Sequence, residues 1–230
     1  MQPEISSENR SAGPEELQVI LTGDGTPTLR NLRLGETYHS RHGAKQESLH
    51  VFIHSGLKLV LKESVHVLEV GFGTGLNTTL TLLQSDKTIH YTAIEPYPVS
   101  PKLLSELNYF LDTGDHHLHL KVIHAEFNET TRITPNFHLT KQRIGLQDFN
   151  VEEKFDVVYF DAFAPMVQPE MWTKDVFTRL IKCMNTNGIL VTYCAKGQVR
   201  RDMIAAGFKV ERIAGPPGKR EMLRAIKKDE

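Results

Sequence analysis

The residues best suited to chemistry lie where a short apolar segment runs into alternating glycines. Gly71, Gly73 and Gly75 are spaced two apart, after the apolar run at 65–70 and before a segment with helical spacing. Glycines here let a ligand lie against bare backbone and allow φ values that side chains forbid. A strand, a glycine turn and a helix in this order predict the first crossover of a nucleotide-binding α/β domain.

The spacing of these glycines differs from that of a dinucleotide-binding turn, where the third glycine follows the second by three residues. Here Gly75 follows Gly73 by two, and Glu69 stands just before the turn. An acid at this point suits a ligand with a cationic or ammonium-bearing part better than a pyrophosphate. The pattern is typical of Rossmann-like methyltransferases and predicts S-adenosylmethionine as the cofactor. Nucleotide binding and a plain structural turn are the alternatives.

Two further acids follow predicted strands, where open α/β sheets bind their ligands. Glu95 ends the strand predicted at 89–94, and its two oxygens can accept both ribose hydroxyls of an adenosine. Asp161 follows the apolar strand predicted at 155–160. It can orient an acceptor amine and take up its proton, because an amine must be neutral when it attacks. The alternatives are a solvated loop acid for Glu95 and a turn cap for Asp161.

Aromatic and basic residues complete the candidate site. Phe163 and Trp172 could form a wall for a planar acceptor such as a base, although core packing is the ordinary fate of such rings. Lys219 and Arg220 would contact phosphates if the acceptor is RNA, and otherwise form a solvated surface.

The histidines at 116–124 do not predict a metal site. His117 and His119 alternate as strand neighbours do, and no cysteine or well-spaced acid completes a ligand set. We therefore expect no bound metal.

Around these residues apolar strands alternate with helices, which implies a mostly parallel sheet covered on both faces. Strands are predicted at 65–70, 89–94, 118–123, 137–144, 155–160, 188–194, 208–213 and 221–226, and helices at 76–83, 103–111, 169–184 and 199–206. No helix separates the last two strands, so we expect an antiparallel C-terminal edge. Ahead of this core, a hairpin within 17–34 and a helix at 47–57 form an N-terminal extension.

The expected organisation is therefore a disordered tail at 1–15, an extension at 16–60 and one α/β domain at 61–230. The net charge of −1 gives no basic field from which nucleic-acid binding could be argued. Cys183 and Cys194 suit reduced thiols of a cytoplasmic protein. No apolar stretch approaches the roughly 20 residues that span a bilayer, so no membrane partner is expected.

From about residue 23 to about residue 226 the chain resembles the methyltransferase domain of the bifunctional tRNA 5-methylaminomethyl-2-thiouridine biosynthesis protein family. The similar stretches are 24–27, 38–40 with Glu47, 69–77, 95–98, 160–165, 169–172, 199–201 and 218–223. This combination is far more specific than one glycine motif.

The resemblance implies methyl transfer from S-adenosylmethionine to the amine of 5-aminomethyl(-2-thio)uridine at the tRNA wobble position. By the family's pattern, Gly71, Gly73 and Gly75 cradle the cofactor, Glu95 holds its ribose and Asp161 lies by the acceptor amine. Glu69 and Asn77, at the two ends of the glycine motif, are our further candidates for cofactor binding. Fused members carry an FAD-dependent oxidase half that prepares the amine. Because 230 residues leave no room for it, we expect a stand-alone methyltransferase that relies on a separate enzyme for the aminomethyl group.

One position departs from the family's pattern. After the third core strand the family shows Gly-Asp, whose Asp can meet the adenine amino group. Leu146 stands at that point here, and Asp148, two residues later, is the substitute we expect.

Three other functions stay open. The same fold and cofactor could serve a small amine or a protein, and polyamine-forming aminopropyl transferases use a related fold and acidic pocket. A non-catalytic RNA-binding module is the second, although it would have no need of Glu69, Glu95 and Asp161 together. A nicotinamide-dependent oxidoreductase is the third, disfavoured by the early third glycine.

Overall fold

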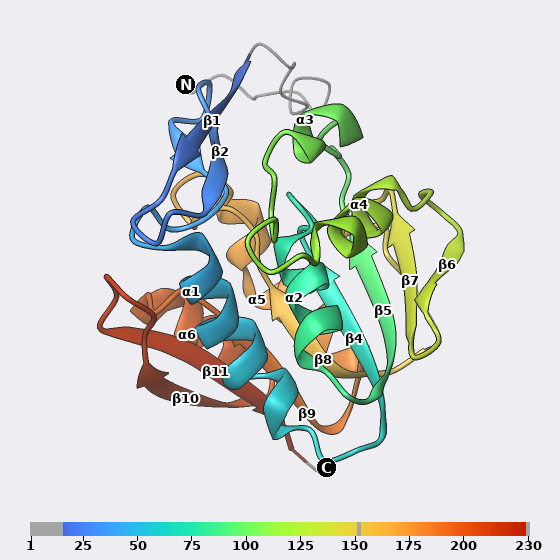
Figure 1. The fold of residues 1–230 in the computed structure, drawn as a ribbon. Helices are drawn as coiled ribbons and strands as arrows, with labels where there is room; N and C mark the ends of the chain where they lie inside the picture. Colours follow the sequence, from blue (N-terminus) through green and yellow to red (C-terminus); the bar gives the residue numbers. More distant parts are fainter. Residues whose placement is uncertain (1–15, 151–152, 229–230) are drawn as a thin grey trace.

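The computed structural model describes residues 16–150 and 153–228, so the tail predicted at 1–15 lies outside the described residues. The main strands are β4 (Ser64–Val70), β5 (Thr88–Ile94), β6 (Thr130–Thr134), β7 (Phe137–Gln142), β8 (Phe155–Phe160), β9 (Met184–Thr192), β10 (Phe208–Ala214) and β11 (Glu221–Lys227). Within the described residues they form one eight-stranded sheet in the order β10-β11-β9-β8-β4-β5-β7-β6 (Figure 1).

The middle of this sheet, from β7 through β5, β4 and β8 to β9, is parallel. At one edge β11 lies antiparallel between β9 and β10, which confirms the predicted C-terminal edge. At the other edge β6 runs antiparallel to β7 and was not predicted. Its sequence, Thr-Thr-Arg-Ile-Thr, contains a single buried position and therefore offers no apolar run.

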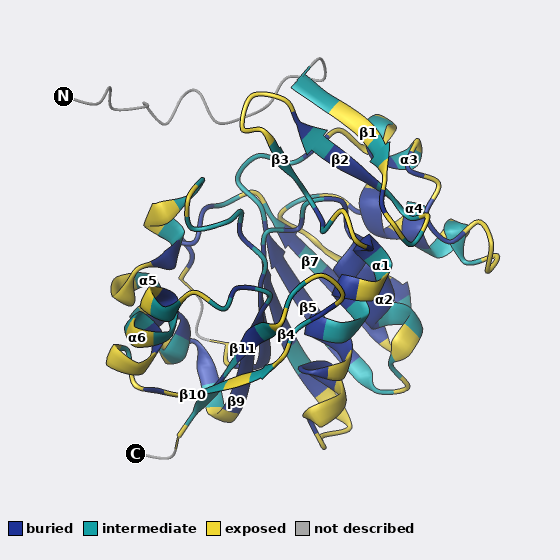
Figure 2. Cartoon of the chain, turned by 90° about the vertical axis from the view of Figure 1, so that its left-hand side faces the viewer, coloured by how far each residue is buried: buried dark blue, intermediate teal, exposed yellow. Residues whose placement is uncertain are grey.

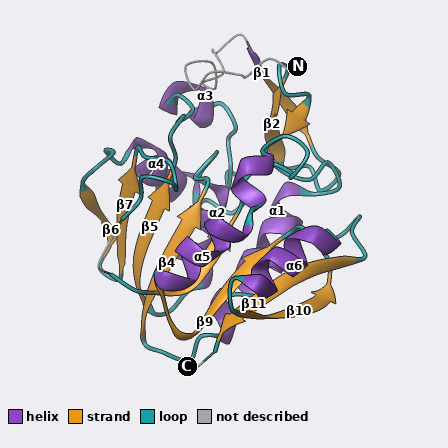
Figure 3. Ribbon diagram, turned by 180° about the vertical axis from the view of Figure 1, so that it is seen from behind, coloured by secondary structure: helices purple, strands orange, loops and turns teal. Residues whose placement is uncertain are grey.

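Helices cover both faces of the sheet (Figures 1 and 3). They are α1 (Ala44–Ser48), η3 (Leu49–His54), η4 (Leu57–Leu59), α2 (Leu76–Gln84), α3 (Pro101–Ser105), α4 (His116–His124), η5 (Pro169–Trp172), α5 (Lys174–Lys182) and α6 (Gly197–Ala205). One core cluster joins the sheet to η3, α2 and α4, through residues such as Phe52 and Leu80. A second joins it to α5 and α6, through Phe177 and Met203. Figure 2 shows the buried strands between these layers.

The strand predicted at 118–123 is wrong, because this segment belongs to helix α4. Its buried positions are His119, Val122 and Ile123, which follow the spacing of one helical face. His119 takes a core position because its ring bonds to the Thr79 hydroxyl at 2.9 Å. From the sequence alone, His117 and His119 look like alternating residues of a strand, because a histidine is not expected at a core position of a helix.

Two predicted helices have different limits. The helix expected at 103–111 ends at Ser105, since Asn108 and Phe110 adopt φ values of 52° and 63° that end a right-handed helix. The helix expected at 169–184 is divided into the 3₁₀ turn η5 and the helix α5. Thr173 separates them and caps α5, its hydroxyl accepting from the Val176 amide at 3.4 Å.

The N-terminal extension forms a small sheet of β1 (Leu17–Leu21), β2 (Pro27–Asn31) and β3 (Glu36–Thr37) above the carboxyl ends of the parallel strands (Figure 1). The carboxylate of Asp24, in the β1–β2 turn, accepts from the Gln46 amide at 3.0 Å and so ties the hairpin to α1. His39 joins the extension to the glycine turn, because its ring bonds to Thr28 at 2.7 Å and to Thr74 at 3.5 Å.

Candidate active site

The glycine turn lies directly against the residue that follows β8. Gly71, Gly73 and Gly75 all have positive φ, at 94°, 52° and 74°. A Cβ added at Gly71 would lie 2.6 Å from the Asp161 carbonyl oxygen. The Asp161 amide donates to the Val70 carbonyl at 3.0 Å. Residues 90 positions apart in the chain are therefore held together, which is why only glycine fits at residue 71.

The Asp161 carboxyl is half-buried and is fixed by one strong contact. Asn77, in the first turn of α2, donates from Nδ2 to Asp161 Oδ2 at 2.8 Å. The pKa of Asp161 is raised to about 7, mainly because the carboxyl is buried and also because the negative charge of Glu47 is near; the bond from Asn77 and the charge of Lys219 act in the opposite direction. Near neutral pH this carboxyl is therefore poised to take up or release a proton.

A second, buried carboxylate lies in the same part of the molecule. Glu47 of α1 accepts from the Ser40 amide at 2.8 Å and from the Lys219 ammonium at 2.6 Å. The ammonium also lies 4.0 Å from the centre of the Tyr193 ring, a cation–π contact. The Tyr193 hydroxyl in turn donates to the Ala162 carbonyl at 2.9 Å. Lys219 thus points toward the acids, and its ammonium is already paired.

No role was predicted from the sequence for Glu47 or Tyr193. Tyr193 directly follows the last residue of β9, so it stands at the carboxyl end of a parallel strand, and that position was a usable signal. Glu47 is an acid on the buried side of a short helix, which is a second signal of a paired group. Their partner Lys219 is 172 residues from Glu47 in the chain, and no local pattern predicts that pair.

Glu95 lies at the end of β5, as predicted, and faces the turn. One of its oxygens accepts from the Gly73 amide at 3.2 Å, and the other accepts from the Tyr97 amide at 3.0 Å. Burial raises the pKa of Glu95, and both of these bonds lower it. Tyr38, from the N-terminal extension, covers the turn, since a Cβ at Gly73 would lie 3.2 Å from its ring.

The two predicted aromatic residues differ in their surroundings. Trp172 is buried, donates from Nε1 to the Phe163 carbonyl at 2.8 Å and packs edge-on against Phe160 at 4.9 Å. Of the two alternatives considered for Trp172, an acceptor wall and core packing, the structure shows core packing. Phe163 is half-buried and meets Tyr38 edge-on at 5.2 Å, so it remains near the glycine turn.

The remaining predicted site residues have other surroundings. Glu69 is fully buried and accepts from the Thr78 hydroxyl at 2.8 Å, on the α2 side of the sheet. Asp148 is exposed in the loop after β7, and Leu146 packs in the core. Arg220 is exposed beside Lys219.

The histidines expected not to bind metal lie along α4, and His116 donates to the Tyr109 carbonyl at 2.8 Å. Within residues 16–150 and 153–228, no three His, Cys, Asp or Glu side chains are grouped to hold a metal ion. None of the helices in those ranges has both the length and the apolar character needed to cross a membrane.

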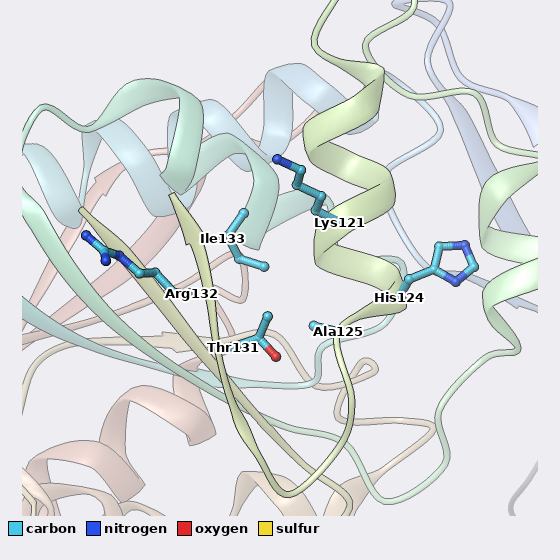
Figure 4. A pocket seen from close by; sticks show the side chains of 6 residues that line it. All are labelled: Lys121, His124, Ala125, Thr131, Arg132 and Ile133. Atoms are coloured by element: carbon cyan, nitrogen blue, oxygen red, sulfur yellow. The ribbon is translucent and has the colours of Figure 1, made fainter. Parts of the chain in front are cut away.

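A surface pocket lies away from the residues around Asp161. It lies between α4 and β6 (Figure 4) and is lined by Lys121, His124, Ala125, Thr131, Arg132 and Ile133. It shares no residue with the group around Asp161.

A family model for S-adenosyl-L-methionine-dependent methyltransferases matches residues 115–228. The bifunctional tRNA 5-methylaminomethyl-2-thiouridine biosynthesis protein MnmC of Cupriavidus metallidurans is 31% identical over 229 residues. MnmC of Pseudoalteromonas atlantica is 29% identical over 234 residues. Each alignment covers 90% of this chain and 33% of the relative, so the chain spans about a third of the length of these curated relatives.

The fold is also similar to a solved structure. The crystal structure of MnmC2 from Aquifex aeolicus matches with a TM-score of 0.72 and 26% identity, over 94% of this chain and 72% of that chain. Such coverage includes both the N-terminal extension and the eight-stranded sheet of the described residues.

Proposed function

This chain belongs to the S-adenosyl-L-methionine-dependent methyltransferases, and we propose that its acceptor is the amine of 5-aminomethyl(-2-thio)uridine at the wobble position of tRNA. The observation that carries the proposal is the place of Asp161: its backbone carbonyl lies against the glycine turn, and its half-buried carboxyl accepts a hydrogen bond from Asn77. The likeness to relatives named for tRNA 5-methylaminomethyl-2-thiouridine biosynthesis supports this choice of acceptor.

The residues around the turn fit S-adenosylmethionine. Gly71, Gly73 and Gly75 carry no side chain, so a ligand can approach their backbone closely. Each Glu95 oxygen keeps a lone pair beyond the one that receives a backbone amide, and so can also accept a ribose hydroxyl. When bound, the cofactor supplies an electrophilic methyl group on a sulfonium. Asp148 stays our candidate for the adenine contact.

Asp161 prepares the amine for attack. Its carboxylate accepts a hydrogen bond from the amine, aims the nitrogen lone pair and takes up the proton that the amine must lose. Asn77 holds Oδ2. Within the described parts of the chain, Oδ1 receives no hydrogen bond and is therefore the oxygen proposed for the amine.

Lys219 helps to keep Asp161 ionised. Its positive charge lowers the pKa of Asp161, against burial and against the charge of Glu47, which both raise it. Glu47 and the Tyr193 ring hold the Lys219 ammonium in position. Because this ammonium is engaged, Arg220 is the better candidate for a tRNA phosphate contact.

The amine has to be made before it is methylated. An amine-forming reaction on the same uridine therefore precedes this one, on another part of the same polypeptide or on a separate enzyme. The methyltransferase reaction itself adds one carbon and leaves the nitrogen in the product.

The test is transfer of radiolabelled methyl from S-adenosylmethionine to bulk tRNA from cells that lack this protein. We expect label in tRNA with the wild type and little with Asp161→Asn, which keeps the shape and removes the proton acceptor. Both proteins should bind S-adenosylhomocysteine with similar affinity. Wild type that binds this ligand but labels only small amines or proteins would reject the tRNA acceptor.

A further inference from the structure

Lys141 is a buried lysine without an acidic partner. It lies in β7 and is 1% exposed. Across residues 16–150 and 153–228, no carboxylate forms an ion pair with it. Charged lysines are rarely buried in this way, because the ammonium loses its hydration. The pKa of Lys141 is lowered to about 8 because the ammonium is buried, and the negative charge of Glu126 acts in the opposite direction, so the group is still charged at neutral pH.

Three groups contact the Lys141 ammonium in place of an acid. It donates to the Ile123 carbonyl at 2.9 Å, in the last turn of α4, where helix carbonyls lack partners within the helix. It also lies over two aromatic rings, 4.6 Å from the centre of Phe127 and 4.9 Å from the centre of Phe72. Cation–π contacts of this kind are strongest where water is excluded. The ammonium is therefore held between a helix end and two rings.

Phe72 is the one of these groups that belongs to the cofactor turn. It stands between Gly71 and Gly73 and is 4% exposed. Its carbonyl accepts from the Gly75 amide at 2.9 Å. Its ring packs against Gly75, where an added Cβ would lie 2.9 Å from the ring Cζ. The position of Phe72 therefore decides the path of the backbone through the three glycines.

The charge of Lys141 is not needed to fill this space. A neutral side chain of similar length would pack against the two rings without giving up the hydration of an ammonium. What the ammonium adds is a directional attraction to the faces of both rings and to the end of α4. Lys141 thus connects β7 and α4 to the side chain inside the glycine turn.

We propose that Lys141 is a positioning residue for the cofactor: its charged ammonium holds Phe72 and so keeps the glycine turn in the shape that receives S-adenosylmethionine. Lys141 acts through Phe72 and makes no contact with the cofactor or the acceptor. No bond is formed or broken, and no proton is transferred. The proposal depends on the family's cofactor and not on the tRNA acceptor.

The first test compares Lys141→Met, which keeps the length of the side chain and removes its charge, with Lys45→Met. Lys45 is the matched control, because its ammonium also lies over a ring, 5.2 Å from the centre of Phe110, and Phe110 is outside the glycine turn. Calorimetry measures binding of S-adenosylhomocysteine. We expect Lys141→Met to weaken it by about tenfold or more, the effect of losing a desolvated cation–π contact, and Lys45→Met to leave it unchanged. Wild-type affinity in Lys141→Met would overturn the proposal.

Urea unfolding separates this role from that of an ordinary core residue. The pKa of Lys141 falls from 10.5 to about 8 in the fold, so the folded protein disfavours its charged form. Lys141→Met should therefore unfold at the same urea concentration as wild type or at a higher one, although it binds the cofactor product more weakly. Loss of stability together with loss of binding would make Lys141 a packing residue and reject the positioning role.

A double-mutant cycle tests the path through Phe72. Phe72→Leu keeps an apolar side chain and removes the ring. Adding Lys141→Met to Phe72→Leu should weaken binding no further, whereas additive losses would show that the two residues act independently and would overturn the proposal. In methyl transfer, Lys141→Met should raise the KM for the cofactor and leave kcat within about twofold. A lower kcat with an unchanged KM would also reject it. The binding measurements hold whichever acceptor the enzyme uses.

Discussion

Replacing Gly71 with alanine tests how the glycine turn and Asp161 depend on each other. The backbone at residue 71 has a φ of 94°, where an L-residue costs about 1–2 kcal/mol. The new Cβ would lie 2.6 Å from the Asp161 carbonyl oxygen, and ordinary contact begins at 3.4 Å, so that carbonyl must retreat by about 0.8 Å. A catalytic group misplaced by nearly 1 Å can cost about 100-fold in rate. We therefore expect Gly71→Ala to lose both stability and most of its methyl transfer.

Gly114→Ala is the matched control. Its φ of 81° carries a similar backbone penalty, but a Cβ there would meet nothing within 4 Å. It should lose about 1–2 kcal/mol of unfolding free energy and keep its methylation rate.

Urea unfolding gives the two stabilities, and single-turnover methyl transfer at saturating cofactor gives the two rates. The stability loss of Gly71→Ala should exceed that of Gly114→Ala, and its rate should fall by about 100-fold. Equal stability losses together with equal rates would show that the collision with the Asp161 carbonyl has no consequence.

Four other changes have defined outcomes. Glu95→Ala should weaken S-adenosylhomocysteine binding by about 1–3 kcal/mol in calorimetry, and unchanged affinity would exclude a ribose contact. Because the carboxylate of Asp161 is the active form and its pKa is about 7, kcat/KM should fall as the pH drops below 7. Lys219→Met should move the midpoint of this pH profile upward, and an unchanged midpoint would show that the Lys219 charge does not lower the pKa of Asp161. Arg220→Ala should reduce the log–log salt slope of tRNA binding by about one, whereas an unaltered slope would remove its phosphate contact. Burial lowers the pKa of His39 from 6.5 to about 4. Between these two pH values the imidazole is neutral in the folded protein and protonated in the unfolded chain, so unfolding takes up a proton. Its contribution to stability should be present above pH 6.5 and should fall by about 3 kcal/mol as pH drops to 4, as measured by urea unfolding, and His39→Gln should flatten this slope.

The sequence predicted the central elements because their patterns are local. β4 and β8 are apolar runs of the length of a strand, and α2 follows the glycine turn with apolar residues at helical spacing. The acids at strand ends, Glu95 and Asp161, could be found for the same reason. The carboxyl ends of parallel strands meet at one edge of the sheet.

Long-range pairing explains what the sequence did not predict. His119 occupies a core position only because Thr79, 40 residues earlier, bonds to its ring, so α4 was mistaken for a strand. The Glu47–Lys219 pair joins the first helix to the last hairpin, and neither residue shows that partner in its own surroundings. Trp172 was a candidate for the acceptor wall, but its bond to the Phe163 carbonyl fixes it in the core.

The proposed function requires that the acceptor is a primary amine on a wobble uridine, bound beside Asp161. The most direct measurement uses two synthetic anticodon stem-loops that differ only at the wobble position, one with 5-aminomethyl-2-thiouridine and one with 2-thiouridine. After incubation with S-adenosylmethionine, the RNA is digested and its nucleosides are weighed by mass spectrometry. We expect one added methyl group on the aminomethyl nucleoside and none on the other. An aminomethyl RNA left unchanged by protein that binds S-adenosylhomocysteine would show that this amine is not the acceptor.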